Sequence, residues 1–177
     1  VYPAVELLTG LVLLQLYLLY GLGANFAYLA FVSAVLIVTG AIDWLHRYIY
    51  TFVILGAALV ALVAGPLLGL DWRNLIVGAL AAGGVFLGFY LLARLLFPSA
   101  GVPFGLGDVY LAIFIGATVG LFNLGQALFY GMLMAGVVSA AILIGRRAGR
   151  ETPTYISYGT YLCLGVLLFI AMGGMSR

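Results

Sequence analysis

Long apolar stretches dominate the sequence, and short segments with charges, prolines or glycines separate them. Four of these stretches carry no charge, and each approaches or exceeds the roughly 17–25 residues that a helix needs to cross a bilayer; they are residues 25–42, 51–65, 74–93 and 123–145. The breakers predict seven helical spans, at 4–20, 25–43, 49–65, 73–96, 107–121, 123–145 and 156–173. The boundary between the fifth and sixth spans, around Phe122 and Asn123, is the least marked.

The composition agrees with a membrane environment. Hydrophobic residues make up 66% of the chain and charged residues 7%, and the mean hydropathy is +1.28. A soluble domain of this size needs far more polar surface. We therefore expect an all-α, polytopic helical membrane protein of about seven transmembrane helices. The connections 98–106 and 146–155 are too short for another domain, so residues 1–177 are predicted to form a single membrane-embedded domain.

Small residues recur within two of the predicted spans. The segments "GALAAGGVFLG" at 78–88 and "GMLMAGVVSAAILIG" at 131–145 contain repeated glycine and alanine. Such residues let helix backbones approach closely in lipid. We expect these glycines to act mainly in helix packing.

The arginines are divided unevenly between the two ends of the predicted spans. The end that is richer in arginine is expected to face the cytoplasm. This orientation places Asp43 and Asp108 together at the cytoplasmic face and the C-terminus outside. The richer end holds Arg47, Arg94, Arg146, Arg147 and Arg150, and the other end holds Arg73 and Arg177.

Several kinds of partner and chemistry are not expected from this sequence. The net charge of +2 is too small and too dispersed for nucleic-acid binding. Cys163 is the only cysteine, which excludes a disulfide or a CxxC metal site within the chain. His46 lies in no metal-ligand spacing, and no GxSxG nucleophile motif is present. We therefore expect no metal and no cofactor.

Three of the five acidic residues have ordinary structural explanations. Asp71 lies in a short connection, where it is expected to be solvated and to cap the following helix. Glu151 belongs to a basic loop and is expected to be solvated. Glu6 lies one turn into the first span, where an interfacial role and a substrate contact are equally plausible.

Asp43 and Asp108 differ from the other acidic residues because each is attached to an apolar helix. A charged group costs roughly 2.5–3.5 kcal/mol at mid-membrane and less near the interface, so such residues usually face a protein interior or a water cavity and mark a functional path. The helix dipole favours an aspartate at a helix N-terminus, which gives Asp108 a possible structural explanation. It disfavours one at a C-terminus, where Asp43 is predicted.

Two carboxylates at one level are suited to general acid/base catalysis. When they are close, like charges keep both from ionising, so the pair shares a proton. The ionised member activates a water, and the protonated member polarises a carbonyl and later protonates the leaving amine. The alternative from another class is a proton-coupled membrane transporter, because membrane carboxylates also serve as proton relays. No internal repeat of the kind found in transporters is evident.

Four ordered segments resemble those of bacterial type IV prepilin peptidases, and "GLGD" at 105–108 resembles the GxGD motif of intramembrane-type aspartic proteases. "YPAVELLTG" at 2–10 is similar to the YPxVELLTG segment, and "AIDWLHRYI" at 41–49 to the segment with the first catalytic aspartate. "GDVYLAIFIGATVG" at 107–120 is similar to GDxKLxxxxGxxxG, and "TPTYISYGTYLCLG" at 152–165 to the late (I)PFGPxLxxG segment. The resemblance covers nearly the whole chain.

The resemblance implies an aspartic endopeptidase with Asp43 and Asp108 as the catalytic pair. It further implies a multi-pass protein of the inner (cytoplasmic) membrane with its active site facing the cytoplasm. The expected substrates are prepilins or pseudopilins of type IV pili and type II secretion, whose basic leader is cleaved after a glycine. Gly105 and Gly107 are expected to let the backbone bend and approach the substrate. Glu6, within the YPxVE segment, is a candidate substrate contact.

The chain also departs from the family pattern. Tyr110 stands where GDxK has lysine, Tyr50 stands where a proline usually follows the first aspartate, and the late segment lacks its PFGP proline. These departures leave open an inactive scaffold that binds pilin-like helices. The cysteine-containing region associated with N-methylation is absent, so no methyltransferase activity is expected. Because the chain begins with Val1, we expect either a truncated piece of a bifunctional enzyme or a minimal, protease-only form.

Overall fold

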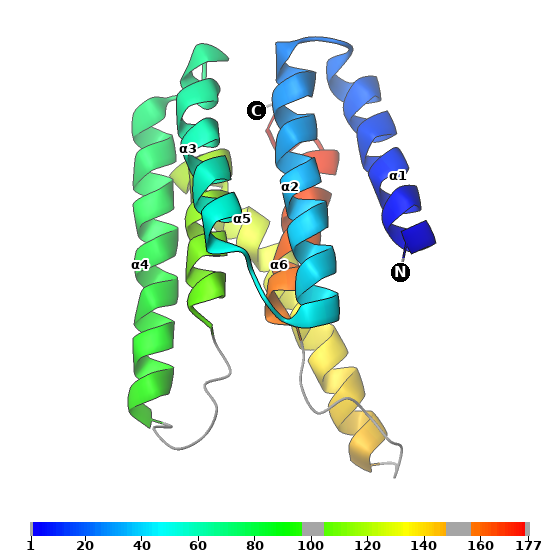
Figure 1. The fold of residues 1–177 in the computed structure, drawn as a ribbon, viewed down its shortest axis with the longest axis vertical. Coiled ribbons are helices and arrows are strands. Elements are labelled where there is room, and N and C mark those ends of the chain that lie inside the picture. Colours follow the sequence, from blue (N-terminus) through cyan, green and yellow to red (C-terminus); the bar gives the residue numbers. More distant parts are fainter. Residues whose placement is uncertain (1, 97–104, 148–156, 176–177) are drawn as a thin grey trace.

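The computed structural model describes residues 2–96, 105–147 and 157–175, and these residues form an α-helical bundle (Figure 1). The predicted all-α architecture is confirmed. Its helices are α1 (Tyr2–Tyr20), α2 (Ala24–His46), α3 (Thr51–Leu67), α4 (Trp72–Leu96), α5 (Leu106–Arg147) and α6 (Tyr158–Ala171).

Four of these helices, α1, α2, α4 and α5, are long and apolar enough to cross a membrane. Helices α3 and α6 are also apolar, but they contain 17 and 14 residues. The structure thus agrees with a membrane protein that has several spans. The expected number of about seven spans stays a prediction.

Helix α5 consists of two arms joined at Gly120. Gly120 has φ 72° and ψ 170°, a backbone conformation that suits glycine and is strained for other residues. The Asn74 side chain of α4 lies where a side chain on Gly120 would be, and its Oδ1 accepts a hydrogen bond from the Phe122 N–H at 3.2 Å. The break between the fifth and sixth predicted spans therefore lies at Gly120 rather than at Phe122 and Asn123.

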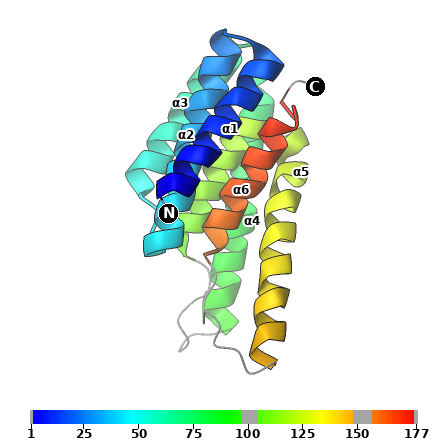
Figure 2. The ribbon, with the colours of Figure 1, turned by 90° about the vertical axis from the view of Figure 1, so that its right-hand side faces the viewer.

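The first arm of α5 is the centre of the bundle. Its side chains Leu111, Phe114 and Ile115 are completely buried. Helices α3 and α4 pack against α5, which also contacts α6. Figure 2 shows the second arm running beside α6 and continuing past the N-terminal end of that helix. Asp108 lies in the first turn of the first arm, so the tightly packed helix holds its backbone in a fixed position.

Glycines mark the places where two pairs of helices come closest. A Cβ on Gly116 of α5 would collide with the backbone of Gly78 on α4, and a Cβ on Gly165 of α6 would collide with Gly131 on α5. These contacts agree with the packing role expected for Gly78 and Gly131. Gly84, Gly88 and Gly136, in the same two small-residue segments, have open space where a Cβ would be.

Helix α1 is attached most loosely to the rest of the bundle. Only Val12 and Leu16 of this helix are buried, and it packs mainly against α2, with a smaller contact to α6. Helix α6 lies against α2 and the second arm of α5. It therefore packs between α2 and α5, as α3 also does.

Candidate active site

Asp43 lies in the last turn of α2, which ends at His46 and has Arg47 as its C-cap residue. Arg47 adopts a left-handed conformation, with φ 54° and ψ 40°, and its N–H donates to the Asp43 carbonyl at 2.9 Å. This C-cap turns the chain away from the helix axis toward α3. The Asp43 side chain points inward, since only 6% of the residue is exposed.

Thr160 of α6 supplies two hydrogen bonds to Asp43. Its backbone N–H donates to Asp43 Oδ2 at 2.8 Å, and its hydroxyl lies 3.0 Å from the same oxygen. Thr160 is the third residue of α6, and the N–H groups of a first helical turn have no acceptor within their own helix. The carboxylate of α2 therefore caps the N-terminus of α6 from outside.

Asp108 occupies the first turn of α5 and is 9% exposed. The Gly105 N–H donates to Asp108 Oδ2 at 3.1 Å, and the Asp108 N–H donates to the Gly105 carbonyl at 3.1 Å. These reciprocal bonds form a small closed turn at the start of the helix. The aspartate at an N-terminus is also favoured by the helix dipole.

The two aspartates lie at the same end of the bundle and interact electrostatically. The negative charge of Asp43 is close enough to Asp108 for the two carboxylates to repel each other. Both carboxylates are also within electrostatic range of the Cys163 side chain, which lies between α2 and α6. Arg47 adds a positive charge near Asp43. The structure thus brings together two carboxylates that the sequence places on different helices.

The buried side chain of Ile49 packs against two glycines, Gly107 next to Asp108 in the chain and Gly159 next to the Asp43 carboxylate in space. A Cβ on Gly107 would lie 2.9 Å from the Ile49 Cβ, and a Cβ on Gly159 would lie 3.2 Å from the Ile49 Cδ1. Ile49 itself is 7% exposed. Gly107 therefore allows the chain before Asp108 to approach Ile49, and its predicted contact with substrate stays a prediction.

The two other acidic residues that the structure describes, Glu6 and Asp71, are exposed, unlike this buried pair. Glu6 is exposed on α1, and among the described residues no hydrogen bond or ion pair joins it to either aspartate. The predicted cap by Asp71 is confirmed, because its Oδ1 accepts a hydrogen bond from the Arg73 N–H at 3.1 Å. Glu151 lies outside the described residues.

The positions that depart from the family pattern differ in their surroundings. Tyr110 is half-buried and packs against the hydrophobic core, one turn from the start of α5. Tyr50 is exposed at the N-cap of α3, where its ring meets that of Tyr48 edge-to-face. Tyr158, at the start of α6, interacts electrostatically with Asp108.

A metal centre is not apparent in the part of the chain that the structure describes. Within residues 2–96, 105–147 and 157–175, no three or more His, Cys, Asp or Glu residues gather into a possible ligand set. Cys163 is buried under Gly40 of α2, and His46 is exposed at the end of that helix.

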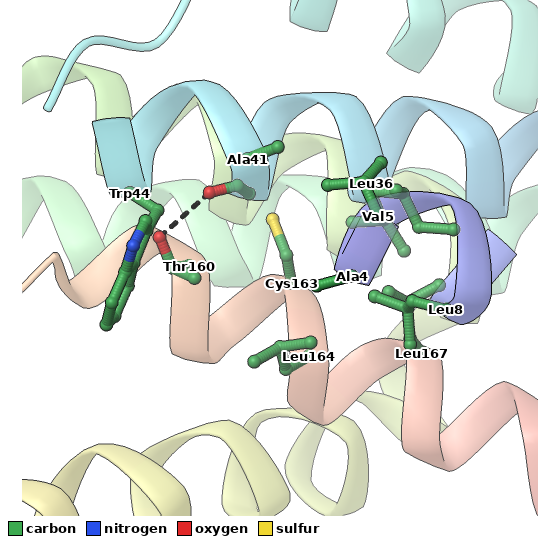
Figure 3. Close-up of a pocket in the computed structure, with 12 residues that line it drawn as sticks. Ala4, Val5, Leu8, Leu36, Ala41, Trp44, Thr160, Cys163, Leu164 and Leu167 are labelled. Carbon is green, nitrogen blue, oxygen red and sulfur yellow. Dashed lines mark hydrogen bonds between the residues drawn. The ribbon is translucent and has the colours of Figure 1, made fainter. Parts of the chain in front are cut away.

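An apolar pocket of about 250 Å³ lies beside Asp43, between α1, α2 and α6 (Figure 3). Helix α1 contributes Ala4, Val5 and Leu8 to its wall. Thr160, whose hydroxyl also lies 3.0 Å from the Gly40 carbonyl, forms one end of the pocket. The pocket thus reaches the pair through Thr160, the hydrogen-bond partner of Asp43, although its lining includes neither aspartate.

Sequence reasoning did not identify Thr160, Gly159 or Ile49 as parts of the site. Thr160 and Gly159 belong to the late segment that resembles the family, although no role was assigned within that segment. In the register of the PFGP pattern, Thr160 stands at a proline position, and proline has no N–H to donate. This departure was the one sequence signal that pointed to Thr160.

A comparison with known families gives one match. The model of the type IV leader peptidase family matches residues 30–140, a stretch that contains both Asp43 and Asp108. No curated protein and no solved structure matches the chain.

Proposed function

The chain belongs to the type IV leader peptidase family, and on that premise we propose that it is a membrane aspartic endopeptidase. It cleaves the leader peptide of type IV prepilins or pseudopilins after a glycine, at the cytoplasmic face of the inner membrane. Asp43 and Asp108 are its catalytic residues.

The observation that carries this proposal is the meeting of two buried carboxylates at one end of an apolar bundle. Asp43 ends α2 and Asp108 begins α5, and they interact electrostatically. Buried carboxylates are costly in such surroundings and usually serve a function. A pair of them supplies the acid and the base that peptide hydrolysis requires.

The reaction follows from one proton shared by the pair. The ionised carboxylate accepts a proton from a water, whose oxygen attacks the carbonyl carbon of the scissile peptide. The protonated carboxyl gives its proton to the carbonyl oxygen, which forms a tetrahedral diol. When the C–N bond breaks, the nitrogen leaves as an amine after taking a proton from one carboxyl, and a diol hydroxyl gives its proton to the other carboxylate. The products are a carboxylic acid and an amine, and the pair again holds one proton.

The surroundings of the pair suit a substrate with an apolar helix. The pocket between α1, α2 and α6 presents apolar side chains beside Asp43 and receives apolar residues of the substrate near the cleaved bond. The basic leader is attracted to the acidic pair. Gly105 and Gly107 lie in the turn that leads to Asp108, where the substrate backbone approaches.

Cleavage of a prepilin-like substrate by purified protein in detergent tests the proposal. The substrate carries a basic leader, a glycine and an apolar helix. The wild type is expected to cut after the glycine, whereas Asp43→Asn and Asp108→Asn are expected to lose about 10²- to 10⁴-fold in rate, the usual contribution of general acid/base catalysis. Mass spectrometry of the products locates the cut.

Asp71→Asn is the matched control, since it removes a carboxylate that caps α4 away from the pair. It should cleave at the wild-type rate. Size-exclusion profiles show whether each variant remains folded. Cleavage that survives either catalytic substitution would defeat the proposal, and substrate binding without cleavage by a folded wild type would favour the scaffold.

A further inference from the structure

The Thr160 hydroxyl makes contacts unlike those of three other described hydroxyls in helices. Each of those three donates to the carbonyl four residues earlier in its own helix, at 2.7 Å: Thr9 to Val5, Thr118 to Phe114 and Ser139 to Ala135. The Thr160 hydroxyl instead reaches α2, where it lies 3.0 Å from both the Gly40 carbonyl and Asp43 Oδ2. The dashed line that starts at Thr160 in Figure 3 marks the contact with the Gly40 carbonyl.

One hydroxyl proton cannot satisfy both acceptors at once. A threonine hydroxyl donates one hydrogen bond and accepts up to two. With Asp43 ionised, the hydroxyl donates to Oδ2, and a hydrogen bond to a charged acceptor is the stronger kind. With a proton on Oδ1, Oδ2 still accepts from the Thr160 backbone N–H, and the hydroxyl proton can turn to the Gly40 carbonyl. Both protonation states of Asp43 thus keep a hydrogen-bond partner.

The backbone of Thr160 holds the same carboxylate oxygen in place. Its N–H donates to Oδ2 at 2.8 Å. The N-cap residue of α6, Ser157, makes no side-chain capping bond, so Asp43 takes the role that an N-cap side chain usually has. The two donors of Thr160 therefore converge on Oδ2. The second oxygen, Oδ1, is left as the atom with which Asp43 meets water or substrate.

We propose that Thr160 is a positioning residue that fixes Oδ2 of Asp43, leaves Oδ1 to react, and keeps the carboxyl bonded in both of its protonation states. This inference rests on the proposed peptidase function, in which each carboxyl gains and loses a proton during one turnover. Thr160 acts through Asp43 and does not contact the scissile bond. Because Thr160 also lines the apolar pocket, a substitution that removes only the hydroxyl and keeps the side chain's shape should slow catalysis without weakening substrate binding.

Thr160→Val tests this role, because it keeps the backbone N–H and the branched shape and removes only the hydroxyl. We expect kcat for the prepilin-like substrate to fall about 10- to 100-fold, the range for a lost hydrogen bond to a charged group. KM should stay within about 2-fold of the wild-type value. Thr160→Ser, which restores the hydroxyl, should recover most of kcat.

Thr118→Val is the matched control, since Thr118 is likewise a buried threonine and its hydroxyl donates to Phe114 within α5. It should leave kcat unchanged. If valine at position 160 prevents folding, Thr160→Ala removes the hydroxyl with less bulk.

The possible results separate this inference from the proposed function. Wild-type kcat in a folded Thr160→Val or Thr160→Ala variant of an active enzyme would overturn the role of Thr160 alone. An equal loss in Thr160→Ser would also overturn it, because a hydroxyl would then not be the group required. A folded wild type that cleaves nothing would overturn the peptidase and the role of Thr160 together.

Discussion

The carboxylate of Asp43 is confined by a glycine as well as by hydrogen bonds. A Cβ on Gly159 would lie 3.0 Å from Asp43 Oδ2 and 3.2 Å from the Ile49 Cδ1. Gly159→Ala is therefore expected to displace the carboxylate and to lower kcat at least about 10-fold, since a displacement of about 1 Å can cost about 10²-fold. Steady-state cleavage kinetics measure the effect.

Gly88→Ala on α4 is the control for this prediction, because no atom lies within 4 Å of its added Cβ. It should keep wild-type kinetics. Full activity in a folded Gly159→Ala variant would mean that the carboxylate tolerates the displacement or that Asp43 is not catalytic.

At the level of single residues, the sequence was informative about which carboxylates to examine and uninformative about what holds them. Asp43 and Asp108 stand out because acidic residues are rare in this chain and these two adjoin apolar helices. The partner of Asp43 lies 117 residues away, and no spacing rule predicts a hydrogen bond over that distance. The partner of Asp108, Gly105, is local and belongs to the motif itself.

Among the helices, the contact of α4 with the first arm of α5 allows the sharpest test of packing. A Cβ on Gly116 would collide with the backbone at Gly78 and Ala79, which cannot rotate away as a side chain can. We expect Gly116→Ala to lower the free energy of unfolding by roughly 1–3 kcal/mol, the usual cost of overpacking. Thermal unfolding in detergent should show a lower Tm.

Gly84→Ala serves as the comparison, because Gly84 lies in the same small-residue segment of α4 as Gly78. Its added Cβ meets no atom within 4 Å, and alanine favours a helix by about 0.5–1 kcal/mol over glycine. Its Tm should equal or exceed that of the wild type. Equal Tm values for the two alanine variants would show that the close approach of α4 and α5 does not limit stability.

Helix positions were predicted well, and the break within α5 less well, for a physical reason. Apolar runs bounded by prolines, glycines and charges mark helices by local composition, which the sequence displays directly. The break at Gly120 depends on Asn74 of another helix, which bonds to the Phe122 N–H. Sequence reading therefore placed the boundary at the nearby polar residue Asn123 instead.

For the whole molecule, the orientation in the membrane remains the largest prediction to test. The turn between α1 and α2 and the far end of α2 lie at opposite ends of the bundle (Figure 1). Leu22 belongs to that turn and Tyr48 follows the far end of α2, and both side chains are well exposed. In a Cys163→Ala background, we expect a membrane-impermeant maleimide to label Tyr48→Cys only from the cytoplasmic side. Leu22→Cys should be labelled only from the other side.

Labelling of inside-out and right-side-out vesicles distinguishes the two sides. The background protein with no cysteine gives the blank. The reverse pattern would place Asp43 and Asp108 away from the cytoplasm, where the predicted cleavage of leaders does not occur.

The bond between Thr160 and Asp43 has a consequence for the newly made protein. Translation produces α2 and α5 before α6, so a chain still attached to the ribosome already contains both aspartates. It lacks the donors that fix Asp43 until α6 has been synthesised and has docked against α2. If the proposed function holds, the chain therefore reaches full activity only once its last described helix has docked and supplied these hydrogen bonds to Asp43.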